Sequence, residues 1–229
     1  MPVDERFLDA SFSLEGLSGT LATRLAALAR TISVPQGKVL FSAGDPGDGL
    51  YAVLDGSLKV VLISGDGVEQ LLDVLGPGSV VGELALFDGR PRSATVMALK
   101  DSTLAFMERV AFDRLAGETP EIYRHMLRIV GRRLRHANDV LAARSFLPLP
   151  GRVAQALLQL ADSFGRPVDA DRTLIHYKVS QAEIASMAGG ARENVSRILN
   201  EFRRSGVVSR ISGYYCIEKR ATLVLAASL

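Results

Sequence analysis

Short apolar runs separated by turn-forming residues dominate residues 31–110. The runs lie at 38–41, 50–54 and 57–63. Glycine, aspartate and proline cluster between and after them, at 44–49, 55–56, 64–67 and 76–78. Several short strands bounded by turns at near-regular spacing predict an antiparallel barrel or sandwich. A short helix is expected before it, because leucines recur at helical spacing: Leu14, Leu17, Leu21, Leu25 and Leu28.

Residues 119–147 have the pattern of one long helix. Thr119, Pro120 and Glu121 supply an N-cap, a proline at the first helical position and an acid in the first turn. Apolar residues then follow at alternating spacings of four and three: Tyr123, Leu127, Val130, Leu134, Ala137 and Leu141. This is the a/d seam of a two-stranded coiled coil, and the opposite face is rich in arginine. We expect a homodimer along this seam, the alternative being a helix packed on its own barrel.

The proline-rich segment 147–151 is expected to end the long helix and to form a hinge. After it, apolar residues at helical spacing predict an amphipathic helix over 152–164. Another helix begins at Ser180, which has Glu183 three residues later, the signature of a capping box.

A glycine turn and a third helix follow. Gly189 and Gly190 form the tight turn, and the helix covers 192–204. Ser212-Gly213 then joins two β-prone runs into a hairpin, the wing. Helix, glycine turn, helix and hairpin predict a winged helix-turn-helix.

The third helix of this motif carries the candidate DNA-binding residues. The positions that face away from its apolar stripe are polar or charged: Arg192, Glu193, Asn194, Ser196, Arg197 and Asn200. Arginine donates a bidentate pair to guanine O6 and N7, and glutamate accepts from cytosine N4. The helix therefore suits the major groove, the alternative being a solvated face with salt bridges. Gln181, which begins the preceding helix, is a further DNA-binding candidate.

Composition and charge narrow the class of protein. Hydrophobic residues make up 48% of the chain and charged residues 23%, as in soluble globular proteins. No apolar run approaches the ~18–20 residues that span a bilayer, and the N-terminus lacks the layout of a signal peptide. Cys216 is the single cysteine, which excludes a disulfide within the chain. We expect a cytoplasmic protein.

The net charge of +2 conceals an asymmetry. Residues 1–118 carry 10 basic and 16 acidic side chains. Residues 119–149 carry 6 and 2, and residues 150–229 carry 11 and 7. A basic C-terminal half behind an acidic N-terminal half indicates that only one end of the chain meets a polyanion.

A candidate phosphate site lies at 81–96. Glycine at position 82 lets the backbone approach a ligand, and the run behind it forms one helical turn with exposed N–H groups. Arg92 pairs with the phosphate, Ser93 adds a hydroxyl donor, and Glu83 accepts from a sugar hydroxyl. The alternative is a strand-ending turn whose arginine serves surface electrostatics. The candidate ligand-binding residues of this stretch are Gly82, Glu83, Leu84, Ala85, Arg92 and Ser93.

Four segments resemble the cyclic AMP receptor protein and fumarate–nitrate regulator (CRP/FNR) family of bacterial transcription regulators. Residues 82–85 followed by 92–94 are similar to that family's phosphate-binding cassette. Residues 132–134 resemble its long dimer helix, 151–154 the start of its DNA-binding domain, and 192–197 its recognition helix. The resemblance covers nearly the whole chain.

The resemblance implies an α+β fold in three parts. These are a cyclic-nucleotide-binding β-roll over 1–118, a dimerisation helix over 119–147 and a winged helix-turn-helix DNA-binding domain over 148–229. It implies a homodimeric, non-enzymatic regulator whose recognition helices are reoriented by a cyclic nucleotide, with cyclic AMP as the first candidate and cyclic GMP as another. The implied partners are a palindromic operator in double-stranded DNA and RNA polymerase, without a metal or a membrane.

Three departures from the family pattern affect these expectations. Family members that bind cyclic AMP usually have threonine where this chain has Ala137, so Asn138 becomes the candidate contact to the base, from the partner subunit. Ala191 stands where the family usually has a serine that caps the recognition helix, and losing a cap typically costs ~1 kcal/mol. The N-terminal cysteine cluster of the iron–sulfur branch is missing.

Other functions remain as alternatives. The chain could bind DNA without a nucleotide, or respond to cyclic GMP or to a cyclic dinucleotide. A haem-based sensor would use histidines such as His125 and His136, which lie 11 residues apart on the long helix. A module regulating an enzyme is disfavoured, because no segment is left for a catalytic domain and no nucleophile–base or metal-ligand constellation is present.

Overall fold

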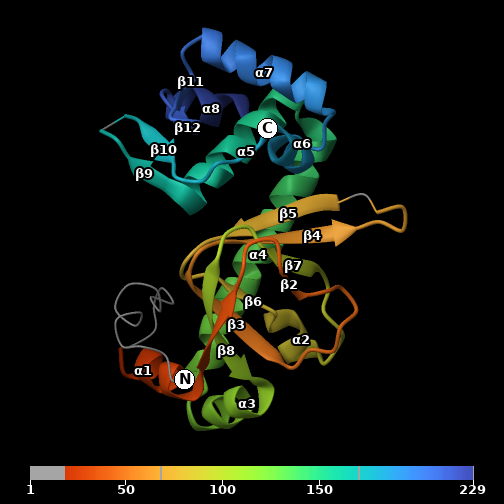
Figure 1. Ribbon diagram of the computed structural model, residues 1–229, viewed down its shortest axis with the longest axis vertical. Helices are drawn as coiled ribbons and strands as arrows, with labels where there is room; N and C mark the ends of the chain where they lie inside the picture. Colours follow the sequence, from red (N-terminus) through yellow and green to blue (C-terminus); the bar gives the residue numbers. More distant parts are fainter. Residues whose placement is uncertain (1–18, 68, 170, 229) are drawn as a thin grey trace. The chain divides into compact units, whose positions relative to one another are not determined.

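The computed structural model describes residues 19–67, 69–169 and 171–228 (Figure 1). They form two compact units, which divide within helix α4 (Glu121–Phe146). The N-terminal unit ends at Leu134, apart from residues 69–71, which group with the C-terminal unit. Of the leucine repeat predicted near the N-terminus, Leu14 and Leu17 lie outside the described residues.

The N-terminal unit is built on two four-stranded antiparallel sheets, with strand orders β1-β8-β3-β6 and β2-β7-β4-β5. The helices of this unit before α4 are α1 (Gly19–Leu28), α2 (Glu83–Asp88) and α3 (Arg109–Glu118). Its strands are β1 (Arg30–Val34), β2 (Val39–Phe41), β3 (Gly49–Asp55), β4 (Leu58–Ile63), β5 (Glu69–Leu75), β6 (Val80–Val81), β7 (Thr95–Ala98) and β8 (Ser102–Glu108). The strands predicted at 38–41, 50–54 and 57–63 are confirmed.

Two apolar clusters stabilise this β-roll. Between the sheets, Val53, Leu58 and Leu104 are fully buried. On the outer side of the first sheet, Phe112 of α3 and Ile122 of α4 pack in a second cluster with residues of α1, β3 and β8. Burying each such side chain contributes roughly 1.5–3 kcal/mol. The second cluster therefore anchors the first turns of α4 on the roll of the same chain.

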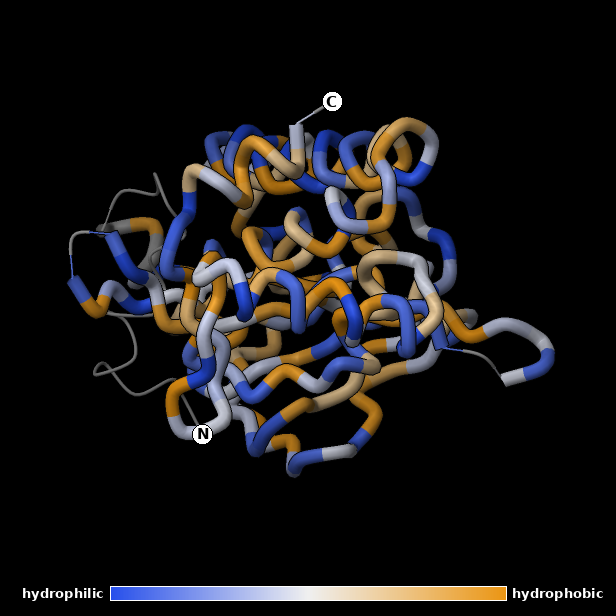
Figure 2. The backbone as a smooth tube through the Cα atoms, turned by 90° about the horizontal axis from the view of Figure 1, so that it is seen from above, coloured by the Kyte–Doolittle hydropathy of each residue, from blue (hydrophilic) through white to orange (hydrophobic). Residues whose placement is uncertain are grey.

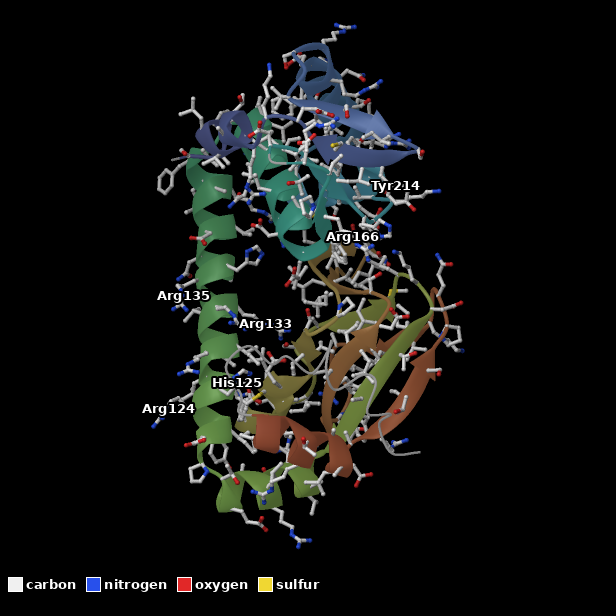
Figure 3. The ribbon with its side chains drawn as sticks, turned by 90° about the vertical axis from the view of Figure 1, so that its left-hand side faces the viewer. Arg124, His125, Arg133, Arg135, Arg166 and Tyr214 are labelled. Atoms are coloured by element: carbon white, nitrogen blue, oxygen red, sulfur yellow. The ribbon has the colours of Figure 1, made fainter. Side chains whose placement is uncertain are left out.

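Helix α4 has two apolar faces. The face on the roll consists of Ile122, His125, Met126 and Ile129, all buried. The predicted seam lies on another face, where Leu127, Leu134 and Leu141 are 69%, 62% and 65% exposed. Figure 3 shows His125 and Arg133 pointing from α4 toward the roll and Arg124 pointing the opposite way. Packing on its own roll thus uses one face, and the seam remains available to a partner.

The C-terminal unit contains three helices around a small antiparallel sheet of order β11-β12-β10-β9 and a final short helix. Its helices after α4 are α5 (Leu149–Phe164), α6 (Gln181–Ala188), α7 (Arg192–Arg204) and α8 (Arg220–Ala226). Its strands are β9 (Gly165–Pro167), β10 (Thr173–Ile175), β11 (Val208–Ile211) and β12 (Tyr214–Ile217). Figure 2 shows hydrophobic and hydrophilic residues interleaved along the described chain. The helix-turn-helix and its wing are confirmed.

The structure differs from the sequence prediction at the hinge. Helix α5 begins at Leu149 rather than at residue 152, because Pro150 occupies the first turn, where its missing N–H costs nothing. Only Leu147 and Pro148 separate α4 from α5, so the hinge is much shorter than the predicted 147–151. Helices α3 and α8 and strands β9 and β10 were not predicted. Strands β9 and β10 have three residues each, too few to show a clear period.

Within the described residues, no helix combines the length and the apolar character required to cross a bilayer.

Candidate ligand site and nucleic-acid interface

A glycine turn joins strand β6 to helix α2. Gly82 has φ of 87°, a left-handed conformation that residues with a Cβ disfavour. A Cβ at this position would also lie 2.3 Å from Nη1 of Arg92. Glycine is therefore required both by the backbone conformation and by the close approach of the arginine. The N–H groups that begin the helix, those of Glu83, Leu84 and Ala85, have no acceptor within it, which suits an anion.

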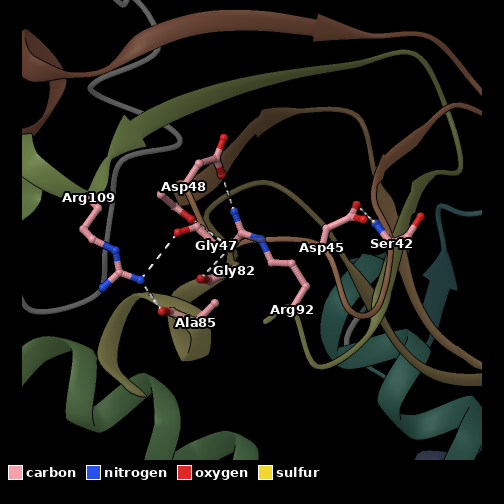
Figure 4. A network of polar contacts seen from close by, with 9 residues as sticks. Ser42, Asp45, Gly47, Asp48, Gly82, Ala85, Arg92 and Arg109 are labelled. Carbon is pink, nitrogen blue, oxygen red and sulfur yellow. Dashed lines mark hydrogen bonds and ion pairs between the residues drawn. The ribbon is translucent and has the colours of Figure 1, made fainter. Parts of the chain in front are cut away.

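Arg92 is 3% exposed and reaches this turn from the loop before β7. Its Nη1 donates to the carbonyl oxygens of Gly49 and Gly82, each at 2.8 Å, and its Nη2 donates to Oδ1 of Asp48 at 2.6 Å (Figure 4). The guanidinium carbon lies 4.3 Å from the ring centre of Phe41. Among the described residues, none accepts from its buried Nε. The guanidinium is thus held in place, with Nε and one Nη2 hydrogen left for a further acceptor.

Glu83, the first residue of α2, is fully buried. Its Oε1 accepts a hydrogen bond from Nη1 of Arg133 on α4, and Nη2 of the same arginine donates to the carbonyl oxygen of Val80. Its other oxygen, Oε2, has no partner in the described part of the chain. The predicted sugar acceptor is therefore an ion-paired carboxylate with one free oxygen, and the pair connects the glycine turn to α4.

Arg133 was not singled out as a site residue. Its position on the helix carried a signal, because it follows Met126 by seven residues and Ile129 by four, on the face that packs on the roll. The arginines that the sequence predicts on the face opposite the seam do not include Arg133. An arginine on a buried helical face needs an acceptor, which Glu83 supplies.

Arg109 holds the other end of α2. Its guanidinium donates to the carbonyl oxygens of Leu86, at 2.7 Å, and of Ala85, and its backbone N–H donates to the carbonyl oxygen of Asp48 at 3.0 Å. Figure 4 shows the contacts of the same guanidinium with Ala85 and Gly47. Gly47 lies so close that a Cβ on it would be 2.5 Å from Cβ of Ala85. Arg92 and Arg109 therefore bind opposite ends of α2 to the loop before β3. The sequence pattern gave no signal for this role of Arg109.

The structure brings four of the predicted ligand residues together: Gly82, Glu83, Ala85 and Arg92. Leu84 follows Glu83 with its side chain 40% exposed. Ser93 is exposed, and no described residue bonds its hydroxyl. Asn138 is exposed on α4 in the other unit, as is Ala137.

The predicted recognition helix, α7, separates into a buried and an exposed face. Val195, Ile198 and Leu199 are buried, whereas the DNA-binding candidates lie on the solvent side. Those exposed are Arg192, Glu193, Asn194 and Arg197, and Ser196 is half-buried. A charged face with no packing role is available for base edges.

The helix before the turn is fixed by its cap. The Ser180 hydroxyl accepts from the N–H of Glu183 at 3.1 Å, and Glu183 accepts from the N–H of Ser180 at 2.7 Å, so the predicted capping box is confirmed. Glu183 also accepts from the Tyr177 hydroxyl at 2.5 Å. Burial and this carboxylate raise the pKa of the Tyr177 hydroxyl, which remains protonated. Gln181 follows the cap and is half-buried.

Arg152 fixes the glycine turn of the helix-turn-helix. Its Nε donates to the carbonyl oxygen of Ala188 at 2.7 Å and its Nη1 to that of Leu147 at 3.0 Å. Gly189 has φ of 60° and ends α6. A Cβ on Gly190 would lie 2.6 Å from Cδ1 of Leu149, so a larger residue there would displace the Leu149 side chain.

Comparisons with known proteins agree with this architecture. A cyclic nucleotide-binding domain model matches residues 31–119, and a Crp-like helix-turn-helix domain model matches residues 151–225. A CRP-like cAMP-activated global transcriptional regulator of Mycobacterium tuberculosis is 35% identical over 199 residues, which cover 87% of this chain and 88% of that protein. A cyclic AMP receptor protein of Thermus thermophilus is 34% identical over 189 residues, 82% of this chain and 84% of that one.

A solved structure agrees as well. A CRP/FNR-family transcriptional regulator from Thermus thermophilus has a TM-score of 0.71 at 25% identity, covering 86% of this chain and 98% of that one. A β-roll with a glycine turn before a short helix, a long helix and a winged helix-turn-helix define the class of DNA-binding transcription regulators with a cyclic-nucleotide-binding domain. The chain belongs to the CRP/FNR family. The predicted resemblance and fold class are confirmed, whereas the domain boundaries and the individual site residues stay predictions.

Proposed function

We propose that the protein is a homodimeric transcription regulator whose DNA binding is controlled by cyclic AMP bound in the β-roll. The observation that carries the ligand part of this proposal is the turn at Gly82. There a buried arginine and the first N–H groups of α2 converge beside a buried carboxylate with one free oxygen. Donors and an acceptor in this arrangement match a phosphate joined to a sugar hydroxyl.

Each site residue then has a defined role. Arg92 and the N–H groups of Leu84 and Ala85 bind the cyclic phosphate, Ser93 donates its hydroxyl, and Oε2 of Glu83 accepts from the ribose. Arg92 is already fixed by backbone carbonyls, so little side-chain entropy is lost on binding.

The adenine contact and the response to the ligand involve α4. Asn138 of the partner subunit contacts the base, because Ala137 stands where family members that bind cyclic AMP usually have a threonine. Because Glu83 bonds Arg133, a ligand that engages Glu83 acts on a residue of the long helix. Through α4, ligand binding shifts the equilibrium between orientations of the two recognition helices. The regulator then acts on promoters with RNA polymerase as a partner.

The DNA part of the proposal rests on the exposed face of α7. Arg192 and Arg197 read guanines, and Glu193 reads the cytosine side of the same half-site. Asn194, Ser196 and Gln181, the last from α6, supply further contacts to bases or phosphates. One recognition helix from each subunit requires a palindromic operator.

Calorimetry with cyclic AMP, cyclic GMP and a cyclic dinucleotide tests the ligand. We expect heat of binding with cyclic AMP and a loss of affinity of about 100-fold or more in Arg92→Ala, because charge-assisted phosphate contacts are strong. Arg114→Ala, an exposed arginine of α3, is the control and retains the wild-type affinity.

Arg92 also bonds the carbonyls of Gly49 and Gly82, so thermal melting of the variant is measured in parallel. Ser93→Ala removes an exposed hydroxyl and provides a second variant that keeps the fold, with a smaller loss of affinity. Unchanged affinity in folded Arg92→Ala overturns the phosphate site. Absence of heat with all three nucleotides, in a protein that binds DNA, favours the alternative of a ligand-independent regulator.

A further inference from the structure

A small cavity lies in the N-terminal unit between the first turns of α4 and the β-roll, with a volume of about 30 Å³. Five other elements contribute apolar side chains to its walls: Leu25 of α1, Leu50 of β3, Val80 of β6, Met107 of β8 and Phe112 of α3. His125 of α4 also lines it, and Figure 3 shows this side chain pointing from the helix toward the roll. The imidazole is 3% exposed, and neither ring nitrogen has a partner among the described residues. One polar side chain thus lies unsatisfied in an otherwise apolar cavity.

The surroundings of His125 disfavour its charged form. In the described part of the chain, α1, β3, β6, β8 and α3 present only apolar side chains to the cavity. The charges that act on His125 are those of Arg132 and Arg128 on its own helix, and both are positive. Burial, and then these two cations, lower the pKa of His125 from its usual value of about 6.5. A protonated imidazole in the closed cavity would be an unpaired buried charge, so the proton is taken up only when the cavity opens to water.

Packing alone does not account for a histidine at this position. Its neighbours on the buried face of α4 are Ile122, Met126 and Ile129. Another apolar side chain would fill the cavity without leaving two nitrogens unsatisfied. Histidine adds one property that such a side chain lacks, a charge that changes between about pH 5 and pH 8.

Two walls of the cavity adjoin the proposed ligand site. The side chain of Val80 lines the cavity, while its carbonyl oxygen accepts from Nη2 of Arg133, and the turn at Gly82 follows two residues later. Leu50 lines the cavity next to Gly49, whose carbonyl oxygen accepts from Nη1 of Arg92 at 2.8 Å. A movement of these walls therefore displaces backbone groups that hold both arginines.

We propose that His125 makes nucleotide binding sensitive to acid, because its protonation opens the cavity and displaces Val80 and Leu50 from beneath the ligand site. This inference rests on the proposed nucleotide binding and adds a means of regulation to it. The nucleotide binds the closed form, in which His125 is neutral, whereas acid favours the open form. Acid therefore weakens nucleotide binding, and by the same linkage nucleotide binding opposes protonation of His125.

Calorimetry of the full-length protein with cyclic AMP at pH 7.5 and at pH 5.5 tests this link. For wild type we expect a lower affinity at pH 5.5, by at most about tenfold for each pH unit below 6.5, because a single proton is involved. His125→Leu and His125→Gln carry no group that takes up this proton, so their affinities should be nearly the same at both pH values. His176→Gln, which removes an exposed histidine of the other unit, is the control and should keep the wild-type pH dependence.

Hydrogen exchange without nucleotide provides a second measurement. After correction for the intrinsic effect of pH on exchange, the amides of residues 122–129 should lose protection at pH 5.5 in wild type and retain it in His125→Leu. Thermal melting at both pH values verifies that each variant is folded.

The outcomes separate this inference from the proposed function. If wild type binds no nucleotide at either pH, the proposed ligand fails, and hydrogen exchange alone decides whether His125 opens the cavity. If wild type binds equally well at both pH values, or if His125→Leu keeps the wild-type pH dependence of binding or of exchange, the inference is overturned.

Discussion

At the scale of residues, the buried polar groups of the β-roll fall into two sets. Arg92 and Glu83 are buried with partners, whereas both ring nitrogens of His125 are buried without a partner among the described residues. His125 lines an apolar cavity of about 30 Å³, too small for haem. Burial lowers the pKa of His125, and the neighbouring charges of Arg132 and Arg128 lower it further. The imidazole of His125 is therefore neutral in the folded protein at neutral pH.

Replacing His125 is expected to stabilise the protein. In wild type the unfolded chain takes up a proton near pH 6.5 and the folded chain does not, so the free energy of unfolding falls as pH drops below about 6.5 toward the folded pKa. His125→Leu removes this loss. We expect the free energy of unfolding to rise by on the order of 1 kcal/mol at neutral pH, because two unsatisfied nitrogens disappear.

Thermal melting from pH 5 to pH 8 at fixed protein concentration measures this. His176→Gln, at an exposed histidine stacked on Tyr214, is the control and keeps the wild-type acid loss. If His125→Leu loses as much stability at acid pH as wild type does, another group is responsible for that loss.

At the scale of elements, α4 and α7 each separate buried and exposed faces. In α4 the buried face docks on the roll, and the seam of Leu127, Leu134 and Leu141 is left exposed. These three are seven residues apart, so they stay on one stripe of a supercoiled pair. These large apolar side chains stabilise the protein only when a partner helix buries them.

We predict that Leu127→Glu/Leu134→Glu converts a dimer into a monomer, because four carboxylates would meet in the seam. Light scattering at micromolar concentration should then give a mass near 24.6 kDa, and twice that value for wild type. Val110→Glu changes an exposed apolar residue of α3 away from the seam and should leave the dimer intact. A wild-type protein that scatters as a monomer would contradict the dimer.

Helix α7 begins without a side-chain cap. Ala191 has an extended backbone, with φ of −63° and ψ of 139°, and no side-chain hydrogen bond. Ala191→Ser places a hydroxyl where the first N–H groups of α7 need an acceptor, and we expect a gain of ~1 kcal/mol in the free energy of unfolding. Thermal melting measures the gain. Ala191→Val offers no acceptor and should show none; an equal gain in both variants would exclude capping as the cause.

At the scale of the whole molecule, two functions are carried by separate units. The predicted ligand residues that are brought together lie in the N-terminal unit, and α7 lies in the C-terminal unit. Control of DNA binding by a ligand then requires coupling between two sites, through an element that belongs to both. Helix α4 is that element, since the division between the units falls within it.

A dimer with one α7 in each subunit should bind a two-fold symmetric operator with half-sites about one helical turn apart. Arg192→Ala should cost ~1–3 kcal/mol on this operator and relax the preference at one base pair of each half-site. Titration of an operator selected from random duplexes, of single-base variants and of a scrambled duplex measures both effects. Equal losses on selected and scrambled duplexes would make Arg192 a backbone contact.

The sequence by itself determined most of the local structure. Short apolar runs bounded by turn residues identified the strands of the roll, and helical spacing of apolar residues identified the long helix and the helix-turn-helix, because such spacing reports which side of a helix is buried. Gly82, Gly189 and Ser180 marked their turns and cap, because the backbone conformation or the hydrogen bond depends on that residue type alone. The resemblance to the CRP/FNR family was also recognisable from the sequence, because each of its motifs is a contiguous segment.

Only the tertiary structure decided which charged residues meet. Glu83 with Arg133, Asp48 with Arg92, and Arg109 with the end of α2 are pairs far apart along the chain. No period or spacing encodes such pairs, because they depend on how the sheets and helices pack. For the same reason, the sequence left open whether α4 packs on its own roll or exposes a seam. Packing showed that it does both, since a helix has more than one face.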